Sequence, residues 1–331
     1  MRKIPATIVT GFLGAGKTSL LRHLLAHAEG RRIALVINEF GELGIDRELL
    51  LGCGIESCRD DDVVELANGC ICCTVAEDFL PALAKLLDRD APPDHILIET
   101  SGLALPKPLL QAFNWPEIKA RVTVDGVVAV IDAPAVAAGR FAANTPALVH
   151  DNPFDEVFGD QLACADLVVL NKADLADDAI LQRVEGEVQA RLRPEAKQLR
   201  TSFGRIAPSV LLGLSAAAED DLAARRSVHD AAGEHDHDDF DSFVVALPKL
   251  ADPAALLARL PRIIAAHDIL RIKGFLDVAG KPFRQVVQAV GPRLAQYFDR
   301  PWRDDEIRAS RLVVIGRKGI DRAAIAAALV V

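Results

Sequence analysis

The sequence predicts an α/β protein with a mostly parallel, doubly wound sheet, followed by a small α+β domain. Two observations predict this fold class. Short continuous apolar runs alternate with helical stretches along most of the chain, and polar residues gather where these runs end. Continuous apolar strands are typical of a parallel sheet covered on both faces. Open α/β sheets bind ligands at the carboxyl ends of their strands, so the polar residues there are candidates for a site.

The elements of the larger domain follow in a regular order. A strand, a glycine loop and a helix are expected in KIPATIVTGFLGAGKTSLLRHLLAHA, and a second strand from Ile33 to Ile37. A short β-branched strand is expected at VVEL, from Val63 to Leu66. Three further strands are expected in DHILIETSG, DGVVAVIDA and ADLVVLNKAD, each an apolar run that ends in polar residues.

A change of pattern marks the end of this domain. The segment AARRSVHDAAGEHDHDDFDSF is charged, rich in histidine and without periodicity, so a linker or loop is expected there. The predicted boundaries are 1–225 for the larger domain, 226–241 for the His/Asp-rich linker and 242–331 for the C-terminal α+β domain. In that last domain we expect strands in SFVVAL, ILRIKGFLDV, FRQVVQAV and RLVVIG, a helix near Asp252 to Leu260, and a terminal helix in DRAAIAAALV.

Composition and charge narrow the class of protein. Half of the 331 residues are hydrophobic, which is ample for a core. The formal net charge of −9 argues against a general nucleic-acid surface or an anionic-membrane surface. We find no signal peptide and no apolar run of membrane-spanning length, and therefore expect a cytoplasmic protein. The six cysteines are then expected to be reduced thiols, for which metal binding or catalysis outranks structural disulfides.

The segment GFLGAGKT, Gly11 to Thr18, matches the P-loop pattern G-x-x-x-x-G-K-[ST] between a strand and a helix. Backbone N–H groups of such a loop close around phosphates, and the helix N-terminus adds a favourable dipole. Lys17 is expected to contact the β- and γ-phosphates, and the Thr18 hydroxyl to bind Mg²⁺. The residues expected to contact the nucleotide here are Gly11, Gly14, Ala15, Gly16, Lys17, Thr18 and Ser19. The alternative, an ordinary glycine turn, is disfavoured by the flanking strand and helix.

The segment NKAD, Asn171 to Asp174, predicts that the base is guanine. A carboxylate at Asp174 can accept from both the N1–H and the N2 amino group of guanine, whereas adenine would present it with a lone pair. A buried polar group left unpaired is costly, so the discrimination should be large. Asn171 is expected to support the loop, and the Lys172 stem to cover the ring face. The alternative is a solvated helix start, since Asp is a common N-cap residue. We find no motif for the last guanine-contacting loop, between Thr201 and Leu214.

Two further segments complete the predicted GTP site. Glu99 ends the apolar strand ILIE, where an acid can hold Mg²⁺ through water, and the N–H of Gly102 can sense the γ-phosphate. The loop NEFGELGID, Asn38 to Asp46, follows the second strand and can become ordered when the γ-phosphate is bound. Its carboxylates, Glu39, Glu42 and Asp46, are candidate metal ligands, and the alternative for each is an acidic surface residue.

Three thiols are crowded together in NGCICCT, at Cys70, Cys72 and Cys73. Thiolates select borderline or soft cations such as Zn²⁺ and Co²⁺ in tetrahedral sites. Three sulfurs would leave one position for water, a carboxylate or a nucleotide oxygen. A redox pair and buried structural cysteines are the alternatives, but a redox pair needs only two thiols.

The remaining thiols and histidines carry weaker signals. His235 and His237 in the linker could hold a metal transiently, or simply belong to an exposed polar segment. Cys53 and Cys58 could join a second site, or be loop cysteines. The remaining cysteine, Cys164, is expected to be buried by packing. His23 and His27 share a helix face and are expected to lie on the surface, and His95 carries no assignable signal.

Taken together, these motifs resemble one known family. The segments GFLGAGKTSLLRHLL, NEFGELGID, NGCICCT, ETSGLALPKPLL and NKADL look like those of the CobW-type P-loop GTPases that handle metals. The likeness runs from Ile4 to about Leu175 and resumes at HDHDDFDSF, LRIKGF and RLVVIG.

The resemblance implies a slow GTPase that uses GTP and Mg²⁺, binds Co²⁺ or Zn²⁺ at the cysteine motif and delivers it to a client metalloenzyme. Co²⁺ is the favoured metal, and cobaltochelatase of cobalamin biosynthesis is the implied client. The C-terminal domain is implied to contact partners. The alternatives are a zinc metallochaperone that serves a zinc enzyme, a thiol redox regulator with nucleotide binding as a secondary feature, and a small-molecule kinase, against which NKAD weighs.

Overall fold

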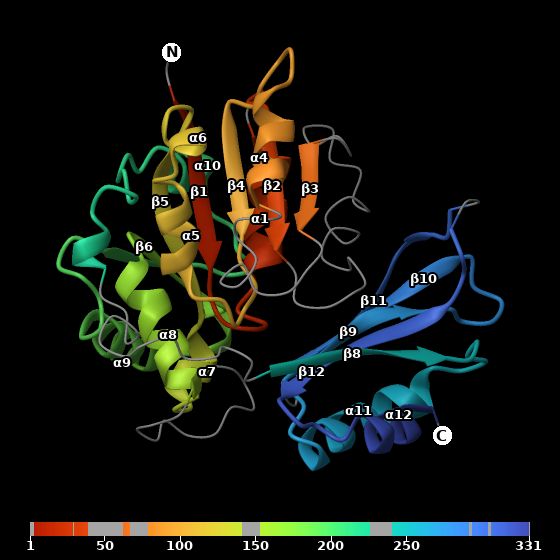
Figure 1. The fold of residues 1–331 in the computed structure, drawn as a ribbon. Coiled ribbons are helices and arrows are strands. Elements are labelled where there is room, and N and C mark those ends of the chain that lie inside the picture. Colours follow the sequence, from red (N-terminus) through yellow and green to blue (C-terminus); the bar gives the residue numbers. More distant parts are fainter. Residues whose placement is uncertain are drawn as a thin grey trace. The chain divides into compact units, whose positions relative to one another are not determined.

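The computed structural model describes residues 3–28, 30–38, 62–66, 79–140, 153–225, 240–290, 293–303 and 306–330. The chain divides into two compact units, and the described residues of each contain one sheet (Figure 1). A parallel sheet comes first and an antiparallel sheet second, which confirms the predicted fold class. No helix in these ranges is long and apolar enough to cross a membrane.

The first unit contains a seven-stranded sheet in the order β3-β2-β4-β1-β5-β6-β7, with every neighbouring pair parallel. Its strands are β1 (Ile4–Thr10), β2 (Ile33–Asn38), β3 (Val63–Leu66), β4 (His95–Glu99), β5 (Val122–Asp132), β6 (Leu167–Asn171) and β7 (Lys197–Arg200). Strands β2, β4 and β6 are fully buried, as their continuous apolar sequences predicted. The edge strand β7 was not predicted, because KQLR has one apolar residue and is partly exposed.

Helices cover both faces of this sheet. In the described part of this unit the helices are α1 (Lys17–Ala26), α4 (Leu80–Leu87), α5 (Pro106–Ala112), α6 (Pro116–Lys119), α7 (Ala133–Ala137), α8 (Pro153–Cys164), α9 (Asp178–Gln189) and α10 (Pro208–Leu211). Two short 3₁₀ helices are η3 (Ala173–Leu175) and η4 (Leu222–Ala224). Side chains of α4, α5 and α6 form one apolar cluster with alternate residues of β1, β2, β4 and β5. The buried leucines of α1 lie outside that cluster, as expected for a helix on the other face (Figure 1).

The second unit contains a five-stranded antiparallel sheet in the order β11-β10-β9-β12-β8. Its strands are β8 (Phe240–Leu247), β9 (Arg271–Leu276), β10 (Phe283–Val290), β11 (Arg293–Pro301) and β12 (Ser310–Arg317). Helices α11 (Ala254–Ala266) and α12 (Arg322–Val330) pack on one face of the sheet and share its apolar core. This sheet with two helices is the predicted small α+β domain.

Two details of the second unit differ from the expectation. Strand β8 already begins at Phe240, inside the predicted linker, and Asp241 accepts hydrogen bonds from the Gly319 N–H and from Arg322. Strand β11, RLAQYFDRP, was not predicted, because its polar residues hide any apolar run. It pairs with β10 as the edge strand of the sheet.

Candidate nucleotide-binding site

The polar ends of four parallel strands meet at one edge of the seven-stranded sheet. The P-loop follows β1, Glu99 ends β4, Asp132 ends β5 and Asn171 ends β6. The strand register places Val9 beside Glu99, and Asp132 beside Asn171. This edge is therefore the place where the fold can hold a ligand.

The P-loop turns sharply into α1, which begins at Lys17 with Gly16 as its N-cap. Gly16 has a φ of 105°, and a Cβ there would lie 2.2 Å from Nδ2 of Asn171. Any other residue at this position would be strained and would displace the Asn171 amide. The glycine thus keeps the backbone close to β6 and leaves the start of α1 open toward an anion.

Lys17 is buried, and its Nζ donates to the backbone oxygen of Gly11 over 2.7 Å. The lysine therefore folds back over its own loop. The Thr18 hydroxyl lies 3.3 Å from Oε1 of Glu99 and donates to it. A hydroxyl and a carboxylate at this spacing, beside a phosphate cradle, fit the water-assisted coordination of Mg²⁺ that was predicted for them.

The segment after β4 lies directly on the P-loop. A Cβ on Gly102 would come within 2.8 Å of the Leu13 backbone nitrogen, so only glycine allows this approach. The buried Gln161 of α8 holds the same segment, because its Nε2 donates to the backbone oxygens of Gly102 (3.4 Å) and Ala104 (3.3 Å). Gln161 was not anticipated, because the sequence pattern does not show which loop its helix faces.

Asn171 connects the P-loop to the predicted base site. Its Nδ2 donates to the backbone oxygen of Ala15 over 2.8 Å, and its Oδ1 accepts from the Gly204 N–H over 3.0 Å. Lys172 has a left-handed backbone, with a φ of 61°. Its Nζ donates to the Gly14 oxygen and to Oδ2 of Asp132, both over 2.7 Å. The lysine stem therefore extends along the P-loop, consistent with its predicted place beside the base.

Asp174 lies in η3 and is exposed, so its carboxylate is accessible to a ligand. Its backbone N–H donates to the Ser202 hydroxyl over 3.2 Å, and the Ala173 N–H donates to the Thr201 oxygen over 3.0 Å. Together with the Asn171–Gly204 bond, these contacts place residues 201–204 beside NKAD. No sequence motif had pointed to this loop. It directly follows β7, so a prediction of that strand would have located it.

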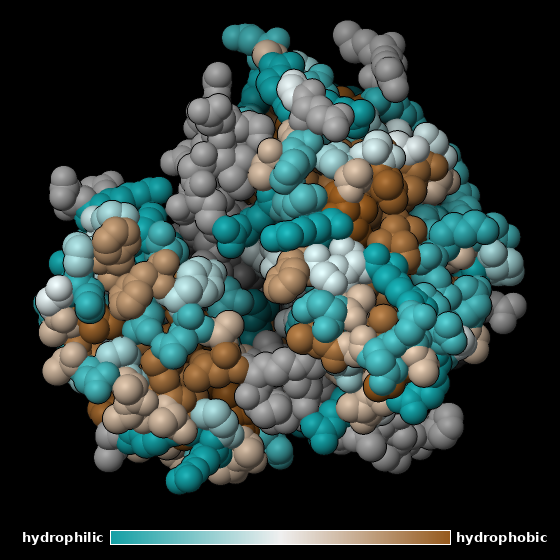
Figure 2. Space-filling view, turned by 180° about the vertical axis from the view of Figure 1, so that it is seen from behind, coloured by the Kyte–Doolittle hydropathy of each residue, from teal (hydrophilic) through white to brown (hydrophobic). Residues whose placement is uncertain are grey.

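Large apolar side chains are exposed on both segments of the predicted base site. Leu175 is 62% exposed and Phe203 is 65% exposed, and the guanidinium of Arg205 lies 5.6 Å from the centre of the Phe203 ring. On the face of the molecule drawn in Figure 2, hydrophobic patches are bordered by hydrophilic residues. Exposed apolar groups beside a carboxylate are what stacking on a purine ring requires.

Several predicted site residues lie outside the described part of the chain. These are Glu39, Glu42, Asp46, Cys53, Cys58, Cys70, Cys72, Cys73, His235 and His237. Within the described ranges, no group of three His, Cys, Asp or Glu side chains could hold a metal ion. Cys164 is buried as predicted, and burial raises the pKa of its thiol to about 12, which suits packing rather than metal binding.

Ser19 and Ala15 complete the predicted P-loop contacts. Ser19 follows Thr18 in the first turn of α1. Ala15 is buried, and its backbone oxygen accepts the hydrogen bond from Asn171. A glycine loop at a helix N-terminus, a buried lysine, a hydroxyl beside a carboxylate and the NKAD segment are therefore assembled at one edge of the sheet. The fold and this site define a P-loop GTPase.

The chain belongs to the family described as CobW/HypB/UreG, nucleotide-binding domain, whose model matches residues 5–200. Residues 240–330 match the Cobalamin synthesis protein cobW C-terminal domain. These matches confirm the resemblance that the motifs indicated.

Curated relatives match over nearly the whole chain. It is 55% identical to "Zinc chaperone CobW" of Sinorhizobium sp, with 99% of this chain and 96% of the relative covered. It is 54% identical to "Zinc chaperone CobW" of Pseudomonas aeruginosa (98% and 90% covered) and 32% identical to "Zinc chaperone YjiA" of Escherichia coli (96% and 95% covered). A crystal structure of Zn(II)-bound YjiA GTPase from E. coli is 28% identical and covers 99% of this chain and 98% of its own, with a TM-score of 0.44.

Proposed function

We propose that this GTPase is a zinc chaperone that binds the metal at its cysteine motif and delivers it to a client protein. The observation that carries the proposal is the 55% identity, over 99% of the chain, to a relative named as a zinc chaperone. Zinc was the alternative to cobalt in the sequence interpretation, and the names of the relatives favour it. The reduced thiols that such a site needs suit a cytoplasmic location.

In this proposal the P-loop and its neighbours hold Mg·GTP. Backbone N–H groups of the loop bind the phosphates, and Lys17 leaves the Gly11 oxygen to contact them. Thr18, Glu99 and Glu39 hold the Mg²⁺ directly or through water. When bound, the ion supplies positive charge that stabilises the phosphoryl oxygens, while the residues of this chain hold the nucleotide in place.

The base is held on the other side of the P-loop. Asp174 accepts from both guanine donors, Asn171 keeps the loop in place, and Lys172 covers the ring. Phe203 and Leu175 form the apolar rim. The experiment for this part is a comparison of GTP and ATP affinity with Mg²⁺ present, in which equal affinities would contradict the assignment.

The metal site is proposed at Cys70, Cys72 and Cys73, on the segment between β3 and α4. Three thiolates suit tetrahedral Zn²⁺ and leave one position for another ligand. The loop carboxylates Glu42 and Asp46 follow β2 and are candidates for that position. Because β2 and β3 are neighbouring parallel strands, the segments after them start from the same edge of the sheet as the P-loop.

Nucleotide and metal sites are proposed to be coupled. If GTP orders the segment after β2, it completes the thiolate site, and hydrolysis then weakens metal binding and allows transfer to the client. Coupling of this kind is reciprocal and amounts to roughly 5–150-fold in affinity. Cobaltochelatase as the client requires Co²⁺ loading and stays a prediction of the family resemblance.

The test is a titration of the full chain with Zn²⁺ and with Co²⁺, with Mg²⁺ held constant and with a non-hydrolysable GTP analogue, GDP or no nucleotide. Zn²⁺ binds thiolates more tightly than Co²⁺ in general, so the change caused by the GTP analogue identifies the metal better than affinity alone. We expect the analogue to tighten Zn²⁺ binding more than Co²⁺ binding. A larger gain for Co²⁺ would favour the cobalt assignment.

Two variants locate the site. Cys72→Ser should lower the affinity for Zn²⁺ and the thiolate-to-metal absorption of bound Co²⁺. Cys164→Ala is the matched control, because Cys164 is buried in the core and should leave metal binding unchanged. Identical metal affinities in all three nucleotide states would overturn the coupling, and an unaffected Cys72→Ser variant would overturn the site.

A further inference from the structure

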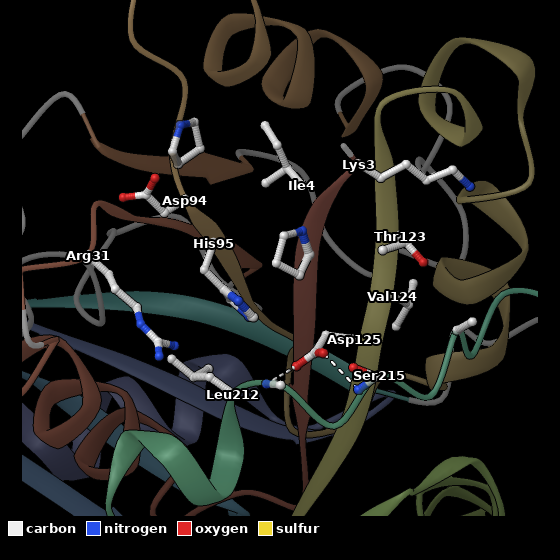
Figure 3. Close-up of a pocket in the computed structure, with 14 residues that line it drawn as sticks. Lys3, Ile4, Arg31, Asp94, His95, Thr123, Val124, Asp125, Leu212 and Ser215 are labelled. Atoms are coloured by element: carbon white, nitrogen blue, oxygen red, sulfur yellow. Dashed lines mark hydrogen bonds between the residues drawn. The ribbon is translucent and has the colours of Figure 1, made fainter. Parts of the chain in front are cut away.

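A cavity lies at the edge of the seven-stranded sheet opposite the P-loop. It has a volume of about 810 Å³ and is lined at the amino ends of β1, β4 and β5 and by the segment after α10 (Figure 3). Ile4 is the first residue of β1 and His95 the first residue of β4, and both line it. None of the residues assigned to the nucleotide or to the transported metal belongs to this cavity.

A β-bulge builds one wall of the cavity. Ala6 pairs with Val124, but Thr7 pairs with Gly126, so Asp125 is an extra residue in β5. Bulges of this kind redirect a side chain. The Asp125 carboxylate is buried and accepts from the backbone N–H groups of Gly213 (2.6 Å), Leu214 (3.1 Å) and Ser215 (2.9 Å). These bonds hold the segment after α10 against the sheet.

A hydrogen-bond relay runs from Asp125 to His95. The Thr7 hydroxyl donates to Oδ2 of Asp125 over 3.4 Å, because a carboxylate can only accept. With the Thr7 proton on Asp125, the Thr7 oxygen, which lies 2.8 Å from Nε2 of His95, accepts from that nitrogen. His95 is only 3% exposed. This relay fixes the proton on Nε2 and leaves Nδ1 of the neutral ring as a hydrogen-bond acceptor.

The charge state of His95 agrees with this geometry. Burial lowers the pKa of His95 to about 4, a shift that Asp125 opposes and the Arg31 guanidinium reinforces. The ring is therefore neutral at physiological pH. No described residue hydrogen-bonds to Nδ1, so a ligand in the cavity that His95 lines can donate to this nitrogen.

Cationic side chains border the same cavity. Arg31 extends into it from the turn before β2, and Lys3 lies at the start of β1 (Figure 3). Two carboxylates, Asp94 and Asp125, also line the cavity. Asp94 accepts from the Arg32 N–H and Asp125 from three backbone N–H groups, whereas no described residue bonds to the Arg31 guanidinium. A ligand with its own negative charge would therefore suit the cavity better than a cation, and no described cluster here could bind a metal ion.

We propose that this cavity binds a small organic anion that carries a hydroxyl or N–H donor beside its carboxylate, with the carboxylate on Arg31 and the donor on Nδ1 of His95. A ligand without the donor would leave the buried Nδ1 of His95 unpaired, which is unfavourable. The relay therefore confers selectivity as well as affinity. This proposal concerns a site apart from the GTPase centre and does not depend on which metal the protein carries.

The test uses L-malate and succinate, which differ by one hydroxyl, in calorimetric titrations of the full chain saturated with Mg·GDP. The wild type should bind L-malate roughly fivefold more tightly than succinate, because this ratio of affinities corresponds to the free energy of one net hydrogen bond. Arg31→Gln should weaken both anions several-fold. Arg32→Gln is the matched control, because it removes the same charge from the next residue, which does not line the cavity.

His95→Gln tests the relay itself. A glutamine that keeps its amide N–H on Thr7 places its amide oxygen away from the position of Nδ1. The preference for malate over succinate should therefore be lost, while GTP hydrolysis stays unchanged. Imidazole ¹⁵N shifts of the wild type should show the Nε2–H form of His95, whether or not the variant folds. The Nδ1–H form, equal binding of malate and succinate by the wild type, or equal effects of Arg31→Gln and Arg32→Gln would each overturn the proposal.

Discussion

The side-chain oxygen of Asn171 accepts a hydrogen bond from the Gly204 N–H over 3.0 Å, and so joins the end of β6 to the loop after β7. The same amide donates to Ala15 in the P-loop. One buried side chain thus fixes the relative positions of the phosphate cradle, NKAD and a loop that no motif revealed. The arrangement of the site depends on this residue even if it makes no direct contact with the base.

Asn171→Ala should weaken GDP and GTP binding together by roughly 5- to 150-fold, because a buried carbonyl and a buried N–H lose their partners. Fluorescent-nucleotide titration measures this. Asn114→Ala is the matched control: its Nδ2 also donates to a backbone oxygen, that of Glu219, but far from the nucleotide site. Equal losses of affinity in both variants would show that Asn171 acts only through general stability.

Gly16→Ala should abolish nucleotide binding, because the added Cβ would meet Nδ2 of Asn171 at 2.2 Å and the backbone has a φ of 105°. Gly30→Ala provides the comparison, since Gly30 also has a positive φ, of 79°, but open space around it. That change should cost about 1–2 kcal/mol of stability and leave nucleotide affinity intact. Nucleotide binding by a folded Gly16→Ala variant would contradict the tight approach described for this glycine.

Asp174→Asn should relax the preference for guanine and admit xanthine nucleotides, whose C2 carbonyl can accept from the new amide. The affinities for GTP and XTP are compared by equilibrium titration. Asp177→Asn is the matched control, because it makes the same change at an exposed aspartate near Asp174. Asp177 caps α9 by accepting from the Ile180 N–H over 2.8 Å. Asparagine is also a good N-cap residue, so this variant should keep the wild-type preference.

Gln161→Leu should lower the affinity for a GTP analogue roughly fivefold while GDP affinity is kept, because the segment that contains Gly102 loses its two donors from α8. Gly102 is predicted to sense only the γ-phosphate, so the ratio of the two affinities is the informative quantity. Gln111→Leu, on the exposed face of α5, should leave the ratio unchanged. An equal loss for GDP would indicate a purely structural role of Gln161.

The stability of the first unit should fall as pH drops from about 6.5 toward 4. Burial lowers the pKa of His95 to about 4, below its ordinary value, so the unfolded chain binds the proton more readily than the folded one. The stability that this neutral histidine contributes is complete above the unfolded pKa and is lost on acidification. From pH 7 to pH 5 the loss should be about 2 kcal/mol.

Urea denaturation at pH 7 and pH 5 measures this loss. A His95→Gln variant has no group that titrates at this position, so its stability should change less between the two pH values. The same pH dependence in variant and wild type would assign the effect to other groups and contradict the buried, neutral state of His95.

The sequence alone determined the features that depend on local order. The P-loop needs glycines at fixed positions just before a helix, and NKAD needs four consecutive residues at a strand end, so both could be identified without a structure. Continuous apolar runs predicted the central strands, because burial on both faces excludes polar residues. The same reasoning could not identify β7 or β11, since edge strands lie partly in solvent and tolerate polar residues.

Only the tertiary structure decided which distant residues meet. Gln161 and Gly102, Asn171 and Gly204, and the three members of the Asp125–Thr7–His95 relay are brought together by strand order, helix placement and one bulge. A bulge shifts the register of every later residue in its strand by one position, and no pattern of apolar residues specified where it falls. His95 therefore looked uninformative in the sequence, whereas in the fold it becomes a buried, oriented acceptor, because hydrogen bonds between distant segments depend on the three-dimensional arrangement of the strands.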